Sequence, residues 1–282
     1  MVSYRFCRPD DLPLLVRAIN ECYDRHFTGR PLMTEESFRS EMREIDLWPS
    51  NCMVAMGKEG PVGVSVATKR GDEVLVRAVG VLPQYQGEGH GRHLVTSLRQ
   101  KLAVLGPERL VAEVPRGDQV AAAFLGSIGF KREADLWDWE RPLGQEAPQS
   151  ELFGGVTVAE LDAVGELKAP KCTAWERQIE TLRGRAETLR GIAVAMPERL
   201  EAWVLYRREG RLAEIVGWGG AAEGSTRSRL FDLLCRRVEG ETGAGLRLPK
   251  LSAAESEGLG LRALGFEPAA GYYRFSGEAV SA

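Results

Sequence analysis

The feature that most constrains this chain is a glycine-rich segment at residues 79–92, which reads VGVLPQYQGEGHGR. It follows a run of β-branched residues and precedes leucines at helical spacing, so it predicts a strand, a tight loop and a helix in that order. Gly87, Gly89 and Gly91 let a ligand approach the backbone, and the N–H groups at a helix start attract anions. The segment therefore predicts a pyrophosphate-binding loop, with a glycine-rich turn of purely structural value as the alternative.

Two common phosphate-binding motifs do not fit this segment. A nucleotide P-loop requires Gly-Lys-Ser/Thr at the helix start, where this chain has Gly91-Arg92-His93. A dinucleotide fingerprint is G-x-G-x-x-G after the first strand of a βαβ unit, whereas the glycines here are spaced G-x-G-x-G. The strands expected before the loop also form an antiparallel meander rather than a βαβ unit. The sequence therefore points away from both nucleotide classes.

The chain length and one irregular stretch indicate two domains. A length of 282 residues favours two domains, each large enough for its own core. Proline, glycine and serine without hydrophobic periodicity mark a linker. We expect a first domain at residues 1–143, a linker at 144–155 and a second domain at 156–282.

The pattern of the first half predicts an α/β (α+β) unit with helices flanking a mixed, mostly antiparallel sheet. Helical spacing is expected from Leu12, from Thr34, over residues 94–105 and over 118–128. Alternating and β-branched runs predict strands at residues 4–8, 53–56, 62–68, 74–81, 109–114, 130–134 and 136–140.

The second half repeats part of the first. Residues 110–130 can be laid on residues 246–266 without a gap, and this register places Gly129-Phe130 opposite Gly265-Phe266. A helix that ends in glycine and is followed by an aromatic residue is common, so coincidence is the alternative. We expect a repeated fold, that is, two domains of the same type.

Composition excludes several classes of protein. With 44% hydrophobic and 27% charged residues the chain should fold, and its net charge of -3 gives no nucleic-acid footprint. The five cysteines contain no C-x-x-C pair, which is typical of a reducing cytoplasm. No apolar run approaches the ~18 residues of a membrane span. We expect a cytoplasmic protein without nucleic-acid or membrane partners, as a monomer or homodimer.

These motifs resemble the GNAT acyltransferase superfamily. Its coenzyme A loop reads Gln or Arg, two residues, Gly, one residue, then Gly or Ala, which Gln86, Gly89 and Gly91 match. The strand before that loop ends in Val-x-Pro, like residues 81–83 here. The family's later helix, Asn-x-x-Ala-x-x-Leu-Tyr-x-x-x-Gly-Phe, is similar to Asp118, Ala121, Phe124, Leu125, Gly129 and Phe130. The resemblance covers residues 3–141, and it reaches residues 156–282 through the repeat.

The resemblance implies acetyl-CoA as cosubstrate and direct transfer of the acetyl group to an amine. The pantetheine arm would run between the strands at residues 74–81 and 109–114, splayed apart to admit it. A main-chain N–H there would stabilise the developing oxyanion. The implied coenzyme-binding residues are Val79, Gly80, Val81, Gln86, Gly87, Glu88, Gly89, His90, Gly91, Arg92 and Asp118.

An attacking amine must first lose a proton, and the candidate bases are Glu73 and Glu113. The alternative is that each is a solvated charge at a strand end. In histone-type relatives the base lies at the position of Leu75 here, and the Tyr that protonates the thiolate in many members is Leu125. Ser127 is a candidate substitute for that hydroxyl.

The resemblance also implies that Tyr23, His26 and Phe27 line the acceptor pocket, with a surface histidine as the alternative for His26. His90 and His93 lie three residues apart near a helix start, but the sequence offers no third ligand, so we expect no metal. Loop packing is their expected role.

The second half lacks a coenzyme loop, because residues 221–227 read AAEGSTR, with one glycine and no leading Gln or Arg. The chain thus resembles the tandem GNAT enzymes, with a degenerate C-terminal repeat. The implied function is an acetyl-CoA-dependent N-acetyltransferase acting on a small-molecule or amino-acid-like amine. The alternative is a non-catalytic coenzyme A-binding sensor or scaffold. The acceptor, and whether the acyl group is acetyl or larger, stay open.

Overall fold

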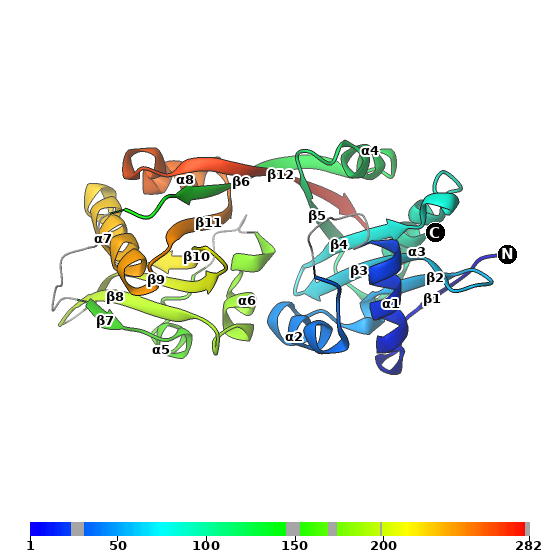
Figure 1. Ribbon diagram of the computed structural model, residues 1–282, viewed down its shortest axis with the longest axis horizontal. Coiled ribbons are helices and arrows are strands. Elements are labelled where there is room, and N and C mark those ends of the chain that lie inside the picture. The colour runs from blue at the N-terminus through cyan, green and yellow to red at the C-terminus, as the bar shows by residue number, and fades with distance from the viewer. Residues whose placement is uncertain (24–30, 145–152, 169–173, 198, 280–282) are drawn as a thin grey trace. The chain divides into compact units, whose positions relative to one another are not determined.

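The computed structural model describes residues 1–23, 31–144, 153–168, 174–197 and 199–279, which form two compact units (Figure 1). The first unit consists of Met1–Glu133 and Tyr273–Ala282, and the second of Ala134–Tyr272. The second unit therefore begins before the expected linker, at Ala134, and the residues from Tyr273 onward belong to the first unit. A division of the chain at residues 144–155 does not predict this. Most of that expected linker lies outside the described residues.

The first unit contains the glycine-rich segment. Its helices are α1 (Leu12–Cys22), α2 (Glu35–Ile45), α3 (His90–Leu105) and α4 (Gln119–Ser127). Its strands are β1 (Ser3–Phe6), β2 (Met53–Met56), β3 (Pro61–Arg70), β4 (Glu73–Val81) and β5 (Arg109–Pro115), in that spatial order. They are followed by β12 (Glu267–Glu278), which belongs to this unit from Tyr273 onward. All neighbours from β1 to β4 are antiparallel, whereas β4 and β5 are parallel.

The second unit has the same plan. Its helices are α5 (Val158–Ala163), α6 (Ile179–Gly184), α7 (Gly224–Thr242) and α8 (Ala253–Leu259). Its strands are β7 (Phe153–Gly155), β8 (Arg190–Met196), β9 (Arg199–Glu209), β10 (Leu212–Gly219) and β11 (Gly245–Leu251), followed by β6 (Lys131–Arg141). The two short strands expected at residues 130–134 and 136–140 form the single strand β6, because no glycine or proline separates them.

The repeat predicted from the sequence is confirmed in its register. Strands β5 and β11 begin and end 136 residues apart, as the alignment of the two halves requires. Gly129 and Gly265 both have positive φ, at 86° and 82°. The amide of Phe130 donates to Leu125 O and that of Phe266 to Leu261 O, each at 3.0 Å. These bonds close the same helix-ending turn in both units, which plain coincidence of sequence would not produce.

The side chains of β4 point alternately to the two faces of the sheet in the first unit. Val74 and Val76 pack with α3, α4 and β5 in a buried apolar cluster. Glu73, by alternation, faces the side on which α1 and α2 lie, and Gly80 directly contacts the end of α1 there. The strand that leads to the glycine-rich loop is thus covered by an apolar core on one face and approached by the end of α1 on the other. Within the described residues, no helix is both long and apolar enough to span a bilayer.

Burial makes the described cysteines poor nucleophiles. Cys7, Cys22, Cys52 and Cys235 are all buried, and burial raises the pKa of the Cys7 and Cys52 thiols to about 12. Because the thiolate is the reactive form, we expect these four cysteines to resist a disulfide reagent at pH 8. Titration with that reagent before and after unfolding in guanidinium measures this. Rapid labelling of Cys7 or Cys52 in the native protein would contradict it.

Candidate active site

The glycine-rich loop leads from β4 through a short 3-10 turn, Pro83–Tyr85, into α3. Gly87 and Gly89 have φ of 80° and 88°, in the left-handed region that favours glycine. Apart from chain neighbours, no described atom lies within 4 Å of a Cβ built on either residue. The first helical hydrogen bond of α3 runs from His93 N to Gly89 O. The N–H groups that come before His93 in the first turn therefore have no acceptor within the helix. The loop therefore presents backbone donors beside open space.

Side chains fix the shape of this loop. Gln86 Nε2 donates to Val81 O at 2.9 Å and ties the loop back to β4. The Tyr4 hydroxyl contacts His90 Nδ1, and the Tyr4 ring lies on His93 with ring centroids 3.9 Å apart. The two histidines thus pack the loop against β1, which is the role that the sequence led us to expect. Among the described residues no group of three potential metal ligands exists.

Strands β4 and β5 separate beside the loop. Their parallel pairing joins Glu73 to Arg109, Val74 to Leu110 and Leu75 to Val111. Both strands continue beyond these pairs, to Val81 and Pro115, but no further pair joins them in the described part of the chain. The edge of β4 that faces β5 is therefore open where it approaches the loop, as expected for the splayed strands.

A β-bulge in β4 lies at the start of this opening. Val66 and Ala67 of β3 pair with Ala78 and Val76, so Arg77 is the extra residue on β4. Beyond the bulge, Leu82 N donates to Val62 O of β3 at 2.9 Å.

The peptide groups of β4 alternate between its two edges. Because hydrogen-bonding groups alternate along a strand, the groups of Val79 and Val81 point away from β3, toward the open edge. The bond from Gln86 to Val81 O agrees with that direction. The main-chain groups of Val79 therefore lie along the gap between β4 and β5.

Gly80, which the sequence assigns to coenzyme binding, has a structural reason to be glycine. A Cβ built there would lie 2.2 Å from Cys22 O, at the end of α1. We expect Gly80→Ala to lower the free energy of unfolding by about 1–3 kcal/mol, because α1 must move away from β4. Gly117→Ala is the matched control, since nothing lies within 4 Å of its Cβ. Denaturant unfolding of both variants measures this, and equal stabilities would contradict the close contact.

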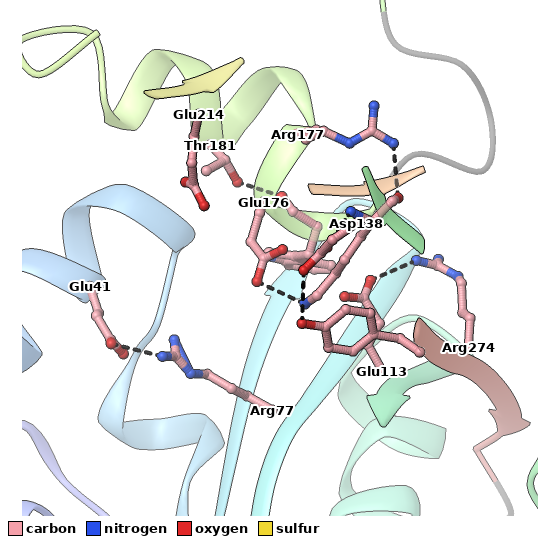
Figure 2. A network of polar contacts seen from close by, with 12 residues as sticks. Glu41, Arg77, Glu113, Asp138, Glu176, Arg177, Thr181, Glu214 and Arg274 are labelled. Atoms are coloured by element: carbon pink, nitrogen blue, oxygen red, sulfur yellow. Dashed lines mark hydrogen bonds and ion pairs between the residues drawn. The ribbon is translucent and has the colours of Figure 1, made fainter. Parts of the chain in front are cut away.

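Glu73 and Glu113, the two candidate bases, meet on one buried arginine. Arg274 of β12 is 2% exposed, and its guanidinium lies 3.1 Å from Glu73. It also lies 3.3 Å from Glu113 (Figure 2). Glu133 is a third partner at 2.8 Å. Burial alone would raise the pKa of the Glu133 carboxyl, but hydrogen bonds from Arg274 and Arg109 outweigh it and lower that pKa.

The positions of the two candidate bases differ. Glu73 belongs to the first β4–β5 pair, whereas Glu113 lies two residues beyond the last pair, where the strands have separated. Sequence reasoning missed Arg274, because it comes from the end of the chain and carries no local motif. The internal repeat offered no signal for it either.

A second ion pair missed from the sequence lies at the bulge. Arg77, the extra residue of β4, donates from Nη2 to Glu41 Oε1 of α2 at 2.8 Å (Figure 2). The pair places a guanidinium and a carboxylate on the α1/α2 face of the sheet. Their sequence separation of 36 residues gives no pattern by which they could have been recognised.

The remaining expected site residues lie as follows. Asp118 caps α4 by accepting from Ala121 N at 2.9 Å. Leu125 is 4% exposed within the apolar core, so it faces packed side chains. The Ser127 hydroxyl donates to Phe124 O at 2.8 Å. Tyr23 follows the end of α1, and its amide donates to Ile19 O. His26 and Phe27 lie outside the described residues.

The sequence model of the acetyltransferase (GNAT) family matches residues 16–130. This chain carries a GNAT domain. The GNAT domain includes the glycine-rich loop, the separating strands β4 and β5, and the helix capped by Asp118. The resemblance inferred from the motifs is thereby confirmed.

The comparison with curated proteins covers a shorter stretch. The mycothiol acetyltransferase of Salinispora arenicola is 39% identical over 79 residues, which are 28% of this chain and 24% of that protein. This chain thus matches about a quarter of the length of that relative.

Solved structures extend the likeness of fold to the whole chain. A GCN5-related N-acetyltransferase from Sphaerobacter thermophilus is similar over 100% of this chain and 98% of its own, with a TM-score of 0.67 and 17% identity. A tandem GNAT protein from the clavulanic acid biosynthesis pathway is similar over the full length of both chains, with a TM-score of 0.68 and 16% identity. At these identities the likeness concerns the fold alone, which over both units is that of a tandem GNAT protein.

Proposed function

We propose that the GNAT domain of this chain transfers an acetyl group from acetyl-CoA to the amine of a small-molecule or amino-acid-like acceptor. The observation that carries the proposal is that the open loop at Gly87 and Gly89 adjoins the gap between β4 and β5. This arrangement suits a ligand that combines a diphosphate with a narrow arm containing amides. Coenzyme A is such a ligand, and it would supply the acyl group as an activated thioester.

Backbone groups would do most of the binding. The N–H groups at the start of α3, within residues 87–92, would hold the diphosphate, and the peptide groups of Val79 would pair with the amides of the arm. An N–H beside the bulge at Arg77 would polarise the thioester carbonyl and stabilise negative charge on its oxygen. Fixed main-chain donors suit this task because they need no reorganisation during the reaction.

The acceptor would approach from the face that carries α1 and α2. We assign proton removal from its ammonium group to Glu113, with Glu73 as the second candidate, because Glu113 lies where the strands have separated. The pair formed by Arg77 and Glu41 offers charges of both signs at the bulge. Both charges together complement a molecule that carries an amino and a carboxyl group, which supports an amino-acid-like acceptor.

One observation favours a second function, a coenzyme A-binding protein without turnover. Leu125, at the position of the family's proton-donating Tyr, is buried in the core and has no proton to give. General acid catalysis contributes about 10² to 10⁴ in rate, so its loss is large but not prohibitive. A thiol with an ordinary pKa near 8.5 is also a fair leaving group.

The second unit and the compartment complete the proposal. The segment after β10 has one glycine within residues 221–227, so we assign coenzyme binding to the first unit alone. The protein would work in the cytoplasm, in keeping with cysteines that are buried as free thiols wherever the chain is described.

Two measurements on the full chain test the proposal. Calorimetric titration with acetyl-CoA should give saturable binding, and a screen of amino acids, amino sugars and polyamines should release free coenzyme A thiol with at least one class. Saturable binding without thiol release across the screen would favour the non-catalytic alternative. Absence of saturable binding would contradict both functions.

A further inference from the structure

Tyr4 of β1 contacts the first turn of α3 with both its hydroxyl and its ring. The hydroxyl contacts His90 Nδ1 across 86 residues of sequence, and the ring lies on His93. Strand β1 stands first in the strand order of the sheet and carries none of the motifs that mark the loop. The side chain of Tyr4 therefore links the edge of the sheet to the helix start that we assign to the diphosphate.

The other ring nitrogen of His90 lies beside a carboxylate of the loop. Nε2 is 3.3 Å from Glu88 Oε2, which is within the range of an ion pair. The His90 side chain is 11% exposed, whereas that of Glu88 is 61% exposed. A mostly buried imidazole thus lies between Tyr4 on one side and an exposed acidic side chain on the other.

Tyr4 determines which nitrogen of His90 carries the ring proton. A neutral imidazole has its proton on one nitrogen and accepts a hydrogen bond with the other. A hydroxyl that donates to Nδ1 leaves the proton on Nε2, the nitrogen next to Glu88. Burial and the Glu88 carboxylate raise the pKa of the Tyr4 hydroxyl, so the hydroxyl keeps its proton and can donate. The partial positive charge of Nε2–H therefore attracts the Glu88 carboxylate toward His90.

Glu88 is an unexpected residue for a loop that binds an anion. It lies between Gly87 and Gly89, whose φ values of 80° and 88° place both in the region where glycine moves freely. Beside these two glycines lies the open space in which the diphosphate would bind. A carboxylate that turned into this space would repel the diphosphate, so the loop needs a contact that holds Glu88 elsewhere.

We propose that Tyr4 is a positioning residue for coenzyme binding, which acts through His90 to hold the Glu88 carboxylate away from the diphosphate. This role rests on the proposed function of the first unit, because it requires a diphosphate at the start of α3. It gives strand β1 a part in binding the coenzyme without any contact between the two. It also explains how an acidic side chain is tolerated between the glycines of the loop.

Calorimetric titration of the full chain with acetyl-CoA at low salt tests the role of Tyr4. Tyr4→Phe keeps the ring on His93 and removes only the hydroxyl. We expect about five- to tenfold weaker binding, the effect of a carboxylate that comes within about 5 Å of a diphosphate. Tyr206→Phe is the matched control, because it removes a hydroxyl that donates to Glu241 in the second unit. Its affinity for acetyl-CoA should equal that of the native chain.

Glu88→Gln separates this electrostatic role from a merely structural one. The glutamine side chain has nearly the same shape but carries no charge, so its position no longer affects the diphosphate. We expect Glu88→Gln to bind acetyl-CoA at least as tightly as the native chain. The double variant with Tyr4→Phe should bind within about twofold of Glu88→Gln alone, since non-additive effects are expected for coupled residues. An equal loss from Tyr4→Phe with and without Glu88 would overturn the proposal.

His90→Phe reaches the same question by a second route, in case Tyr4→Phe does not fold. It keeps an aromatic ring but removes both nitrogens, so acetyl-CoA binding should weaken as in Tyr4→Phe and recover when Glu88→Gln is added. Native binding together with native-like affinity in both ring variants would overturn the role of Tyr4 alone. Absence of saturable binding to the native chain would instead overturn the coenzyme loop, and this role with it.

Discussion

Gly89→Val is expected to weaken acetyl-CoA binding at least a hundredfold. Gly89 is the N-cap residue of α3 and has φ of 88°, a conformation in which a β-branched residue is strongly disfavoured. The valine side chain would also occupy the open space next to the first turn of the helix, where the diphosphate would lie. A hundredfold loss corresponds to about 2.7 kcal/mol, which one or two lost charge-assisted hydrogen bonds would account for. Calorimetric titration with acetyl-CoA measures it.

The matched control for Gly89→Val is Gly210→Val. Gly210 lies in the turn between β9 and β10 with φ of 62°, and it also has nothing within 4 Å of its Cβ. Valine there introduces comparable backbone strain in the second unit. Both variants should lose stability, but only Gly89→Val should lose acetyl-CoA affinity. If the two variants bind acetyl-CoA equally well, the loop does not bind the coenzyme.

The loop and the repeat were the parts most open to prediction from sequence, because both depend on local patterns. Alternating glycines before a helix determine the loop, and its conformation at Gly87 and Gly89 follows from the freedom of glycine. The repeat was visible because a glycine and a buried aromatic residue must close the helix that follows β5 and β11. In each case one short stretch of sequence determines the geometry.

The polar network around the candidate bases was not predictable, because its members come from distant segments. Glu73 and Glu113 were recognised as strand residues near the expected gap. Their partner Arg274 is 161 residues from Glu113 and belongs to the last strand, which joins the first unit. A linear division of the chain placed that strand in the other domain. Charges that pair across a fold leave no periodic pattern in the sequence, so only the topology reveals them.

The same reasoning explains why the sequence did not reveal the structural role of Gly80. A glycine next to a coenzyme loop resembles a position where a ligand approaches the backbone. In the structure, the carbonyl of Cys22 also lies close to it. The sequence shows that Gly80 has no side chain, but it does not show which neighbouring group occupies the space that a side chain would need.

Glu113→Gln is expected to reduce kcat by about 10² to 10⁴, the usual contribution of a general base. The amide has nearly the same shape and can still contact Arg274, so the change removes the proton acceptor without removing the side chain. We choose glutamine rather than a change at Arg274 itself. Breaking a buried ion pair there would cost about 3–5 kcal/mol and leave three carboxylates without their shared arginine.

The other two carboxylates on Arg274 supply the controls. Glu133→Gln removes a neighbour with the same partner, and Glu73→Gln removes the candidate at the paired end of the strands. With an amine found by the thiol-release screen, we expect KM for acetyl-CoA to stay within threefold in all three variants. The large loss of kcat should occur only in Glu113→Gln.

The three variants separate a chemical role from a structural one. If Glu73→Gln loses kcat and Glu113→Gln keeps it, the base lies at the paired end of β4 and β5, and the acceptor approaches further from the loop than we infer. If all three variants lose stability equally and none lowers kcat, the carboxylates serve only to hold Arg274. A proton must then leave the acceptor amine through another group, because an ammonium ion has no lone pair with which to attack a thioester.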